Sequence, residues 1–105
     1  MGYIYLIYDS YQEAFKIGVT KGDVKKRLKK LQTGNPMELR LIYKYKTEYP
    51  YRLEMMLHNH YKDHQILNEW YGGIDEDDFI RKCEEFNDII ISLIDNPFFN
   101  KDLKF

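Results

Sequence analysis

A single arginine stands at the apolar edge of an otherwise lysine-rich segment. In GDVKKRLKKL, residues 22–31, a helical period places Val24, Leu28 and Leu31 on one stripe and four lysines on the opposite arc. Arg27 falls beside the apolar stripe. A guanidinium grips a phosphate or carboxylate through two parallel hydrogen bonds, so Arg27 is a candidate phosphate ligand. The alternatives are an internal salt bridge or packing of the aliphatic stem over the core edge.

A carboxylate lies at the flank of a second expected helix, residues 51–64. Glu54 is next to the inner stripe that contains Leu53 and Leu57. A lone carboxylate in that position could hold a Mg²⁺ that keeps most of its waters and binds a substrate phosphate. The alternative is a surface pair with His58, one turn later. Because His58 shares the Glu54 side of the helix, we expect it near any site there.

A tyrosine and a lysine occupy two strands that should be neighbours. A phenol such as Tyr5 is normally a poor base, with a pKa of about 10. A nearby ammonium, such as that of Lys16, or a metal ion would favour the ionised phenol. The alternatives are core packing for Tyr5 and the solvated side of an edge strand for Lys16.

Three histidines within seven residues raise the question of zinc. His60 and His64 are four residues apart, as two zinc ligands on a helix can be. No cysteine or carboxylate with zinc-ligand spacing completes the set, because Cys83 lies on another element. We therefore expect His60 to be a core histidine and His64 to end its helix.

The elements that must position these side chains are short and few. We expect strands over residues 3–8, 14–20 and 38–46 and an irregular segment at 66–73. The first helix should begin with residues 22–31 and end near residues 33–36, and two further helices should cover residues 51–64 and 75–94. The first strand should be buried on both faces. The third alternates Leu39, Leu41, Tyr43 and Tyr45 with mainly basic residues, which predicts one basic face. The order β-β-α-β-α-α predicts an α+β fold, with a small three-stranded antiparallel sheet flanked by helices.

Length and charge predict one domain with two electrostatic faces. We expect residues 1–73 to form the core, and the acidic helix and tail of residues 74–105 to pack on it. The net charge of −1 conceals an asymmetry. Residues 16–46 hold ten bases and two acids, a balance of +8, and residues 69–105 hold four bases and ten acids, a balance of −6. One face could then meet a polyanion while the other repels it. Surface decoration without function is the alternative.

The remaining composition points to a reducing, cytoplasmic setting. Cys83 is the only cysteine, so no disulfide forms within the chain. The N-terminus has no basic leader, and the longest later apolar run, IIISLI, is far below a membrane span. We expect no membrane partner.

Five sequence blocks fall in the order of a known family. They are YIY at 3–5, KIG at 16–18, VTKGDVKKRLKKLQTGNP at 19–36, the Glu54-x-x-x-His58 pair and Glu69-Trp70-Tyr71. Together they resemble the GIY-YIG nuclease superfamily and, within it, the small phage-encoded DNA-binding branch. The resemblance covers residues 2–71.

The resemblance implies a metal-dependent endonuclease that hydrolyses DNA phosphodiesters in the cytoplasm, the host's if the protein is viral. In that family the residue at Tyr5 acts as general base or orients water, and the residue at Arg27 stabilises the scissile phosphate. The glutamate at Glu54 binds one divalent ion, Mg²⁺ or Mn²⁺. We add Lys16 and His58 as catalytic candidates.

Two positions depart from the family pattern, with Tyr3 in place of a glycine and Lys16 in place of the second tyrosine. Lys16 could assist Tyr5 or contact the phosphate. The lysines expected to contact the backbone of DNA, or of RNA, are Lys21, Lys25, Lys26 and Lys30. No separate targeting domain fits in the chain, so a protein partner would have to supply targeting.

Two other functions remain open at this stage. One is a catalytically weak or inactive GIY-YIG domain that binds nucleic acid or a protein partner as a regulator. The other is a protein-binding module that uses the acidic helix after Gly73.

Overall fold

A five-stranded antiparallel sheet carries helices on both faces in the computed structural model, which describes residues 1–96. The predicted α+β class is correct, and the predicted count of three strands is wrong. The predicted packing of the tail, residues 97–105, lies outside the described residues. The elements are β1 (Gly2–Asp9), β2 (Ala14–Thr20), α1 (Val24–Thr33), β3 (Leu39–Thr47), α2 (Pro50–His60), the 3₁₀ helix η1 (Lys62–His64), β4 (Gln65–Leu67), β5 (Trp70–Gly72) and α3 (Glu76–Asp95).

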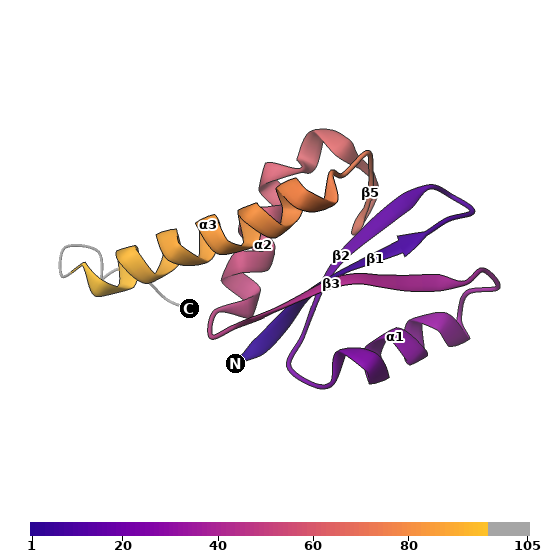
Figure 1. Ribbon diagram of the computed structural model, residues 1–105, viewed down its shortest axis with the longest axis horizontal. Coiled ribbons are helices and arrows are strands. Elements are labelled where there is room, and N and C mark those ends of the chain that lie inside the picture. Colours follow the sequence, from indigo (N-terminus) through magenta and orange to yellow (C-terminus); the bar gives the residue numbers. More distant parts are fainter. Residues whose placement is uncertain (97–105) are drawn as a thin grey trace.

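The three expected strands form the centre of the sheet, in the order β3-β1-β2-β5-β4. β1 is rich in β-branched and aromatic residues, which favour a strand, and it pairs on both sides. Its residues 4–7 are buried, as predicted for a strand covered on both faces. Figure 1 shows α1 on one side of these strands and α2 with α3 on the other.

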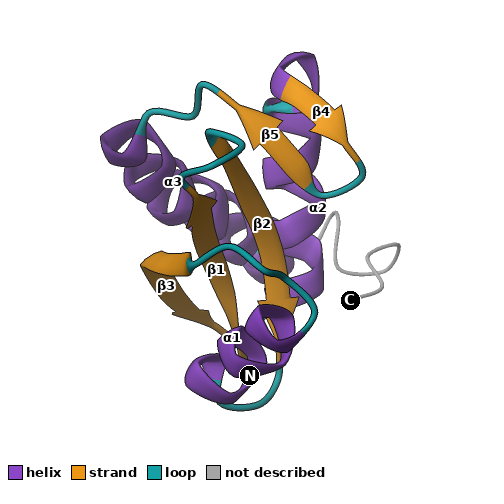
Figure 2. Ribbon diagram, turned by 90° about the vertical axis from the view of Figure 1, so that its right-hand side faces the viewer, coloured by secondary structure: helices purple, strands orange, loops and turns teal. Residues whose placement is uncertain are grey.

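The segment predicted to be irregular is instead a hairpin. Strands β4 and β5 continue the sheet beyond β2, as Figure 2 shows. The turn between them places Asn68 at a φ of 53°, in the left-handed region that asparagine tolerates better than most residues. β5 pairs with β2, with Trp70 opposite Lys16. Consequently β2 is an interior strand, and the alternative that Lys16 lies on an edge strand is wrong.

The sheet separates two apolar clusters. Beneath α2 and α3, strand residues such as Ile4 and Leu6 pack with Leu53, Leu57 and Phe79. Beneath α1, a smaller cluster joins Tyr5, Ile7, Val24 and Leu39. Cys83 belongs to the first cluster, and burial raises the pKa of its thiol to about 12.

A β-bulge in β3 overturns the predicted basic face. Leu6 pairs with Tyr43 but Ile7 pairs with Leu41, so one residue of β3 is left out of the register. The strand therefore turns over, and Leu39 and Leu41 face α1 while Tyr43 and Tyr45 face α3. The basic residues divide in the same way. Lys44 lies over the Tyr3 ring, and Arg40 lies over Tyr8 on the opposite face.

Local side-chain bonds determine where the helices begin and end. The Asp23 carboxylate caps α1 by accepting a hydrogen bond from the Lys25 amide at 2.8 Å. The Gln32 side chain holds the loop after α1, because it bonds the backbone of residues 35, 37 and 39. The second helix ends at His60, earlier than predicted, and η1 continues to His64. Across residues 1–96, no helix combines the length and apolar character needed to cross a membrane.

Gly18 leaves the space that the Tyr5 ring fills. The two residues are opposite each other on β2 and β1. A Cβ atom at Gly18 would lie 2.3 Å from both Cζ and the hydroxyl oxygen of Tyr5, far inside van der Waals contact. Tyr5 is itself only 1% exposed, so its ring cannot simply swing into solvent. The glycine of the KIG block therefore positions the tyrosine of the YIY block.

Gly18→Ala is accordingly expected to lower the free energy of unfolding by about 1–3 kcal/mol, the usual cost of overpacking a core. Gly34→Ala is the matched control, because a Cβ there meets no atom within 4 Å and the φ of −90° suits alanine. The control should be neutral or slightly stabilising. Urea unfolding of both variants and the parent measures the difference. Equal stability of the two variants would refute the packing role of Gly18.

Candidate functional site

Tyr5 and Arg27 meet on the face of the sheet covered by α1. The Arg27 Nε donates a hydrogen bond of 3.4 Å to the Tyr5 hydroxyl. Arg27 is an exposed residue, and its contact through Nε is with the buried Tyr5. The hydrogen bond to Tyr5 raises the pKa of Arg27, and the negative charge of Glu69 raises it further. Arg27 therefore combines a fixed position with an accessible cation.

Lys16 is a buried lysine paired with Glu69. Its ammonium lies 2.7 Å from Glu69 Oε2 and 5.6 Å from the centre of the Trp70 ring. Lys16 shares a sheet face with Gly18 and hence with Tyr5, since successive side chains of a strand alternate in direction. Its hydrogen-bond partner, however, is Glu69. The expected assistance from Lys16 to Tyr5 is not seen as a direct contact.

Glu54 and His58 form a pair on α2. His58 Nε2 lies 3.6 Å from Glu54 Oε2, at the i, i+4 spacing of a helix turn. Both side chains are about one-fifth exposed, so the pair is more buried than an ordinary surface ion pair. The other ring nitrogen of His58, Nδ1, is hydrogen-bonded to the hydroxyl of Tyr71 on β5. Burial raises the pKa of Tyr71, and the charges of Glu69 and Glu54 raise it further, so the phenol stays neutral.

Glu69 lies next to Lys16 and also next to the Glu54–His58 pair. Its carboxylate lies with the side-chain ligand atoms of Glu54 and His58, all within 4.8 Å of one another. It also reaches Lys16, as described above, and its charge acts on Arg27. Its backbone carbonyl accepts a hydrogen bond of 3.1 Å from the Ile17 amide, which fixes this part of the chain against β2.

The structure arranges the five predicted catalytic candidates as two contacting pairs and a lysine. Tyr5 contacts Arg27 directly, and Glu54 contacts His58 directly. Lys16 is bonded to Glu69, whose carboxylate lies with the Glu54–His58 pair and whose charge also acts on Arg27. Within residues 1–96 no direct contact joins Arg27 to Glu54, and Glu69 is the residue that interacts with both of them. Two helices and two strands supply the five candidates, and the turn before β5 supplies the residue that links them.

The other two histidines lie away from this group. His60 is exposed rather than part of the core, and its ring packs edge-on against Tyr61 and Phe86. The expectation of a core histidine is wrong because α2 turns this position toward the rim of the helical layer. His64 ends η1, and its Nδ1 lies 3.2 Å from the Gly72 carbonyl oxygen.

Sequence reasoning missed the role of the Glu69-Trp70-Tyr71 block. The block was noted as a family signature, but no site role was assigned to its members. In the structure Glu69 binds Lys16, Trp70 lies against the same ammonium, and Tyr71 holds His58. The signal available was the Glu-Trp-aromatic pattern itself. Its meaning depends on β5 pairing with β2, which periodicity did not predict.

The four lysines expected to contact a phosphate backbone are all exposed. Three of them lie on α1, and the fourth, Lys21, precedes that helix and lies over the Tyr51 ring at 5.5 Å. Five bases and no acids occupy α1, a charge of +5. The lysines on α1 are Lys25, Lys26, Lys29 and Lys30.

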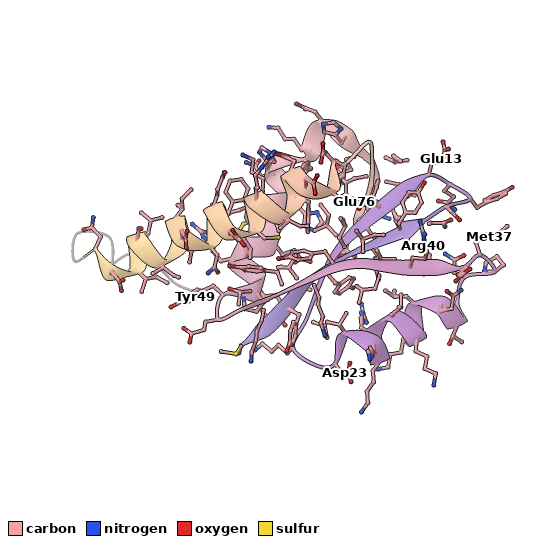
Figure 3. The ribbon with its side chains drawn as sticks, in the orientation of Figure 1. Glu13, Asp23, Met37, Arg40, Tyr49 and Glu76 are labelled. Carbon is pink, nitrogen blue, oxygen red and sulfur yellow. The ribbon has the colours of Figure 1, made fainter. Side chains whose placement is uncertain are left out.

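The opposite face of the molecule is acidic. Helix α3 carries seven acids and two bases, a charge of −5. Figure 3 labels Asp23 at the start of α1 and Glu76 at the start of α3, and the two lie on opposite sides of the sheet. The charge asymmetry of the sequence is therefore an asymmetry in space, with Arg27 on the basic side.

Comparison with known proteins places the chain in a family. The T5orf172 domain matches residues 2–87, which span every described strand and most of α3. No curated protein and no solved structure matches the chain. The match includes Tyr5, Lys16, Arg27, Glu54 and the hairpin that carries Glu69. The protein belongs to the T5orf172 domain family.

Proposed function

We propose that the protein is a metal-dependent nuclease that hydrolyses phosphodiester bonds of DNA at the group formed by Tyr5, Arg27, Lys16, Glu54 and Glu69. One observation carries the proposal: residues far apart in sequence form a contacting Tyr5–Arg27 pair and, linked to it through the charge of Glu69, a group of Lys16, Glu54 and Glu69, which together supply a hydroxyl, two cations and two carboxylates. These are the groups that metal-assisted phosphoryl hydrolysis requires. The basic surface of α1 favours a polyanionic substrate, as does the family resemblance.

Arg27 is assigned to the scissile phosphate. Its Nε bonds Tyr5, and its two terminal nitrogens make no hydrogen bond within residues 1–96. Those nitrogens form the fork that matches two phosphate oxygens. As negative charge builds up during attack on phosphorus, a fixed guanidinium stabilises it without reorganising.

Tyr5 is assigned to the attacking water. Its hydroxyl lies next to the Arg27 fork and is held from behind by the packing against Gly18. In that position it orients the water or accepts its proton. An oxygen–phosphorus bond forms and the ester bond to the leaving oxygen breaks. The attacking water loses one proton, through Tyr5 or directly to solvent, and the leaving oxygen takes up one proton from solvent, so that the step balances.

Glu54 is assigned to the metal. The donor atoms near it are those of His58 and Glu69, a set of oxygen and nitrogen ligands that fits a divalent ion such as Mg²⁺ or Mn²⁺. Such an ion, when bound, polarises the phosphate and stabilises the charge on the leaving oxygen.

A second candidate function is a domain that binds nucleic acid without cutting it. The observation that favours it is the pairing of Lys16, which stands where the family resemblance has a tyrosine. Its ammonium is bonded to Glu69 and lies over Trp70, so Lys16 has a structural role in this state. The basic face of α1 would serve this function equally well.

Arg27→Ala and Glu54→Gln are each expected to reduce plasmid nicking about 100-fold, the usual effect of removing one group that stabilises transition-state charge. The measurement is conversion of supercoiled plasmid in Mg²⁺ and in Mn²⁺. Arg81→Ala and Glu84→Gln on α3 are matched controls and should nick like the parent. Thermal unfolding of each variant checks that folding is retained.

Nicking by Arg27→Ala at the parental rate would contradict the proposal. Salt-sensitive DNA binding by a parent protein that never nicks would instead support the second candidate.

The basic face can be tested separately. Replacing Lys25, Lys26 and Lys30 together by alanine should weaken DNA binding and lower the slope of log affinity against log salt by about 2–3, because each phosphate contact contributes about 0.9. The control replaces Lys62, Arg81 and Lys82, which removes the same charge from the acidic side. Fluorescence anisotropy with a short duplex, measured over a salt series, gives both slopes. Equal losses in the two triple variants would show that binding depends on net charge alone.

A further inference from the structure

The Glu54 carboxylate has two further possible metal ligands beside it, the imidazole of His58 and the carboxylate of Glu69. Two of the residues lie one turn apart on α2, and the third comes from the turn that precedes β5. The Glu54 and His58 side chains are 19% and 24% exposed, and that of Glu69 is 46% exposed, so two of the three ligands are largely shielded from solvent. The three side chains combine two carboxylates and an imidazole, which is a common ligand set for first-row divalent metals.

We propose that these three residues form one metal centre that prefers Mn²⁺ to Mg²⁺, and that the Glu69 carboxylate exchanges its ion pair with Lys16 for binding to the metal. The inference rests on the proposed function for the presence of a metal at Glu54. It extends that function by assigning two further ligands and an internal cation that competes with the metal.

The orientation of His58 supports a ligand role. Metal-binding histidines usually have their second ring nitrogen held by a hydrogen-bonding partner, which fixes the ring. Here that partner is the hydroxyl of Tyr71, a residue 1% exposed and paired in the sheet. The ring is therefore fixed with Nε2 directed at Glu54. When Nε2 binds a metal, Nδ1 carries the proton and donates it to the Tyr71 oxygen, which is able to accept.

The Glu69–Lys16 pair supports the exchange of partners. The Glu69 side chain is 46% exposed, whereas that of Lys16 is 11% exposed. The carboxylate therefore has room to rotate, while the lysine is confined by the strand and by Trp70. The Glu69 backbone does not need to move, because its carbonyl stays bonded to the Ile17 amide.

The two carboxylates also lie close enough to bind one cation together. Glu54 and Glu69 lie together, and Lys16 neutralises only one of them. A divalent ion shared by both removes their mutual repulsion. Mg²⁺ prefers oxygen ligands and keeps most of its waters, whereas Mn²⁺ accepts an imidazole more readily. The presence of His58 is the basis of the expected preference.

The exchange would change what Lys16 can do. Its ammonium would lose the carboxylate and stay on the sheet face that it shares with Tyr5 and Gly18. A phosphate oxygen is then the natural replacement partner for the cation. Metal binding would thus release a positive charge on the side where Arg27 lies.

Mn²⁺ binding to the full-length protein without nucleic acid tests the ligand set. Free Mn²⁺ is followed by electron paramagnetic resonance and Mg²⁺ by competition. Glu54→Gln, His58→Gln and Glu69→Gln should each weaken Mn²⁺ binding about tenfold or more. His58→Gln should also reduce the preference for Mn²⁺ over Mg²⁺. His60→Gln on the same helix and Glu84→Gln on α3 are the controls and should bind Mn²⁺ like the parent.

Lys16→Met tests whether the Lys16 ammonium competes with the metal for the Glu69 carboxylate. The expected result is a gain in Mn²⁺ affinity, which a misfolded variant would not give. Removing the competing ammonium should tighten Mn²⁺ binding several-fold. Unchanged affinity in this variant would overturn the exchange of partners.

The outcomes also separate this inference from the proposed function. Loss of Mn²⁺ binding in Glu54→Gln alone, with normal binding in His58→Gln and Glu69→Gln, would overturn the three-ligand centre and leave the nuclease proposal intact. Parental Mn²⁺ binding in all three variants would overturn both.

Discussion

The ion pair between Lys16 and Glu69 is the interaction on which the candidate site depends. A buried ammonium needs a partner, because leaving it unpaired away from water is costly. Glu69 can serve only because β5 pairs with β2 and brings the preceding turn against Lys16. The same carboxylate lies beside Glu54 and His58. One short contact thus joins residues of the α1 side to residues of α2.

The rest of the site follows from how the sheet divides the molecule. The missing side chain at Gly18 lets the Tyr5 ring lie across β2, so that its hydroxyl meets Arg27. Around this point α1 carries a charge of +5, while α3, across the sheet, carries −5. A polyanion approaching such a molecule is attracted to one side and repelled from the other. The charge distribution would therefore orient a polyanion toward the exposed Arg27.

Periodicity was sufficient to predict the long elements and insufficient for the short ones. The apolar runs of β1 and β2 and the helical stripes of α1, α2 and α3 extend over seven residues or more, so their patterns are clear. Strands β4 and β5 have three residues each, too few to show an alternation. The bulge in β3 was also invisible, because its pattern of alternating residues continues through the position where the pairing shifts.

Candidate residues could be named from the sequence where the family resemblance includes them. They could not be named where a contact between residues far apart in the sequence defines the role. Arg27, Tyr5 and Glu54 are candidates because of their positions on the expected elements and because of the family resemblance. The role of Glu69 comes from a partner 53 positions away in the sequence, and that of Tyr71 from the ring of His58. Neither contact leaves a periodic signal, because each exists only after the hairpin has joined the sheet.

If Arg27 and Glu54 act on one phosphate, a divalent metal and DNA should bind cooperatively, and measuring this cooperativity is the most direct test. The affinity for a short duplex is measured with and without Ca²⁺, used as a divalent ion in place of the one that supports cleavage. If the two ligands share a site, Ca²⁺ should raise DNA affinity at least about fivefold in the parent and not in Glu54→Gln. If Ca²⁺ changes the affinity of both proteins by the same factor, the metal and the phosphate occupy separate places, and the account is wrong.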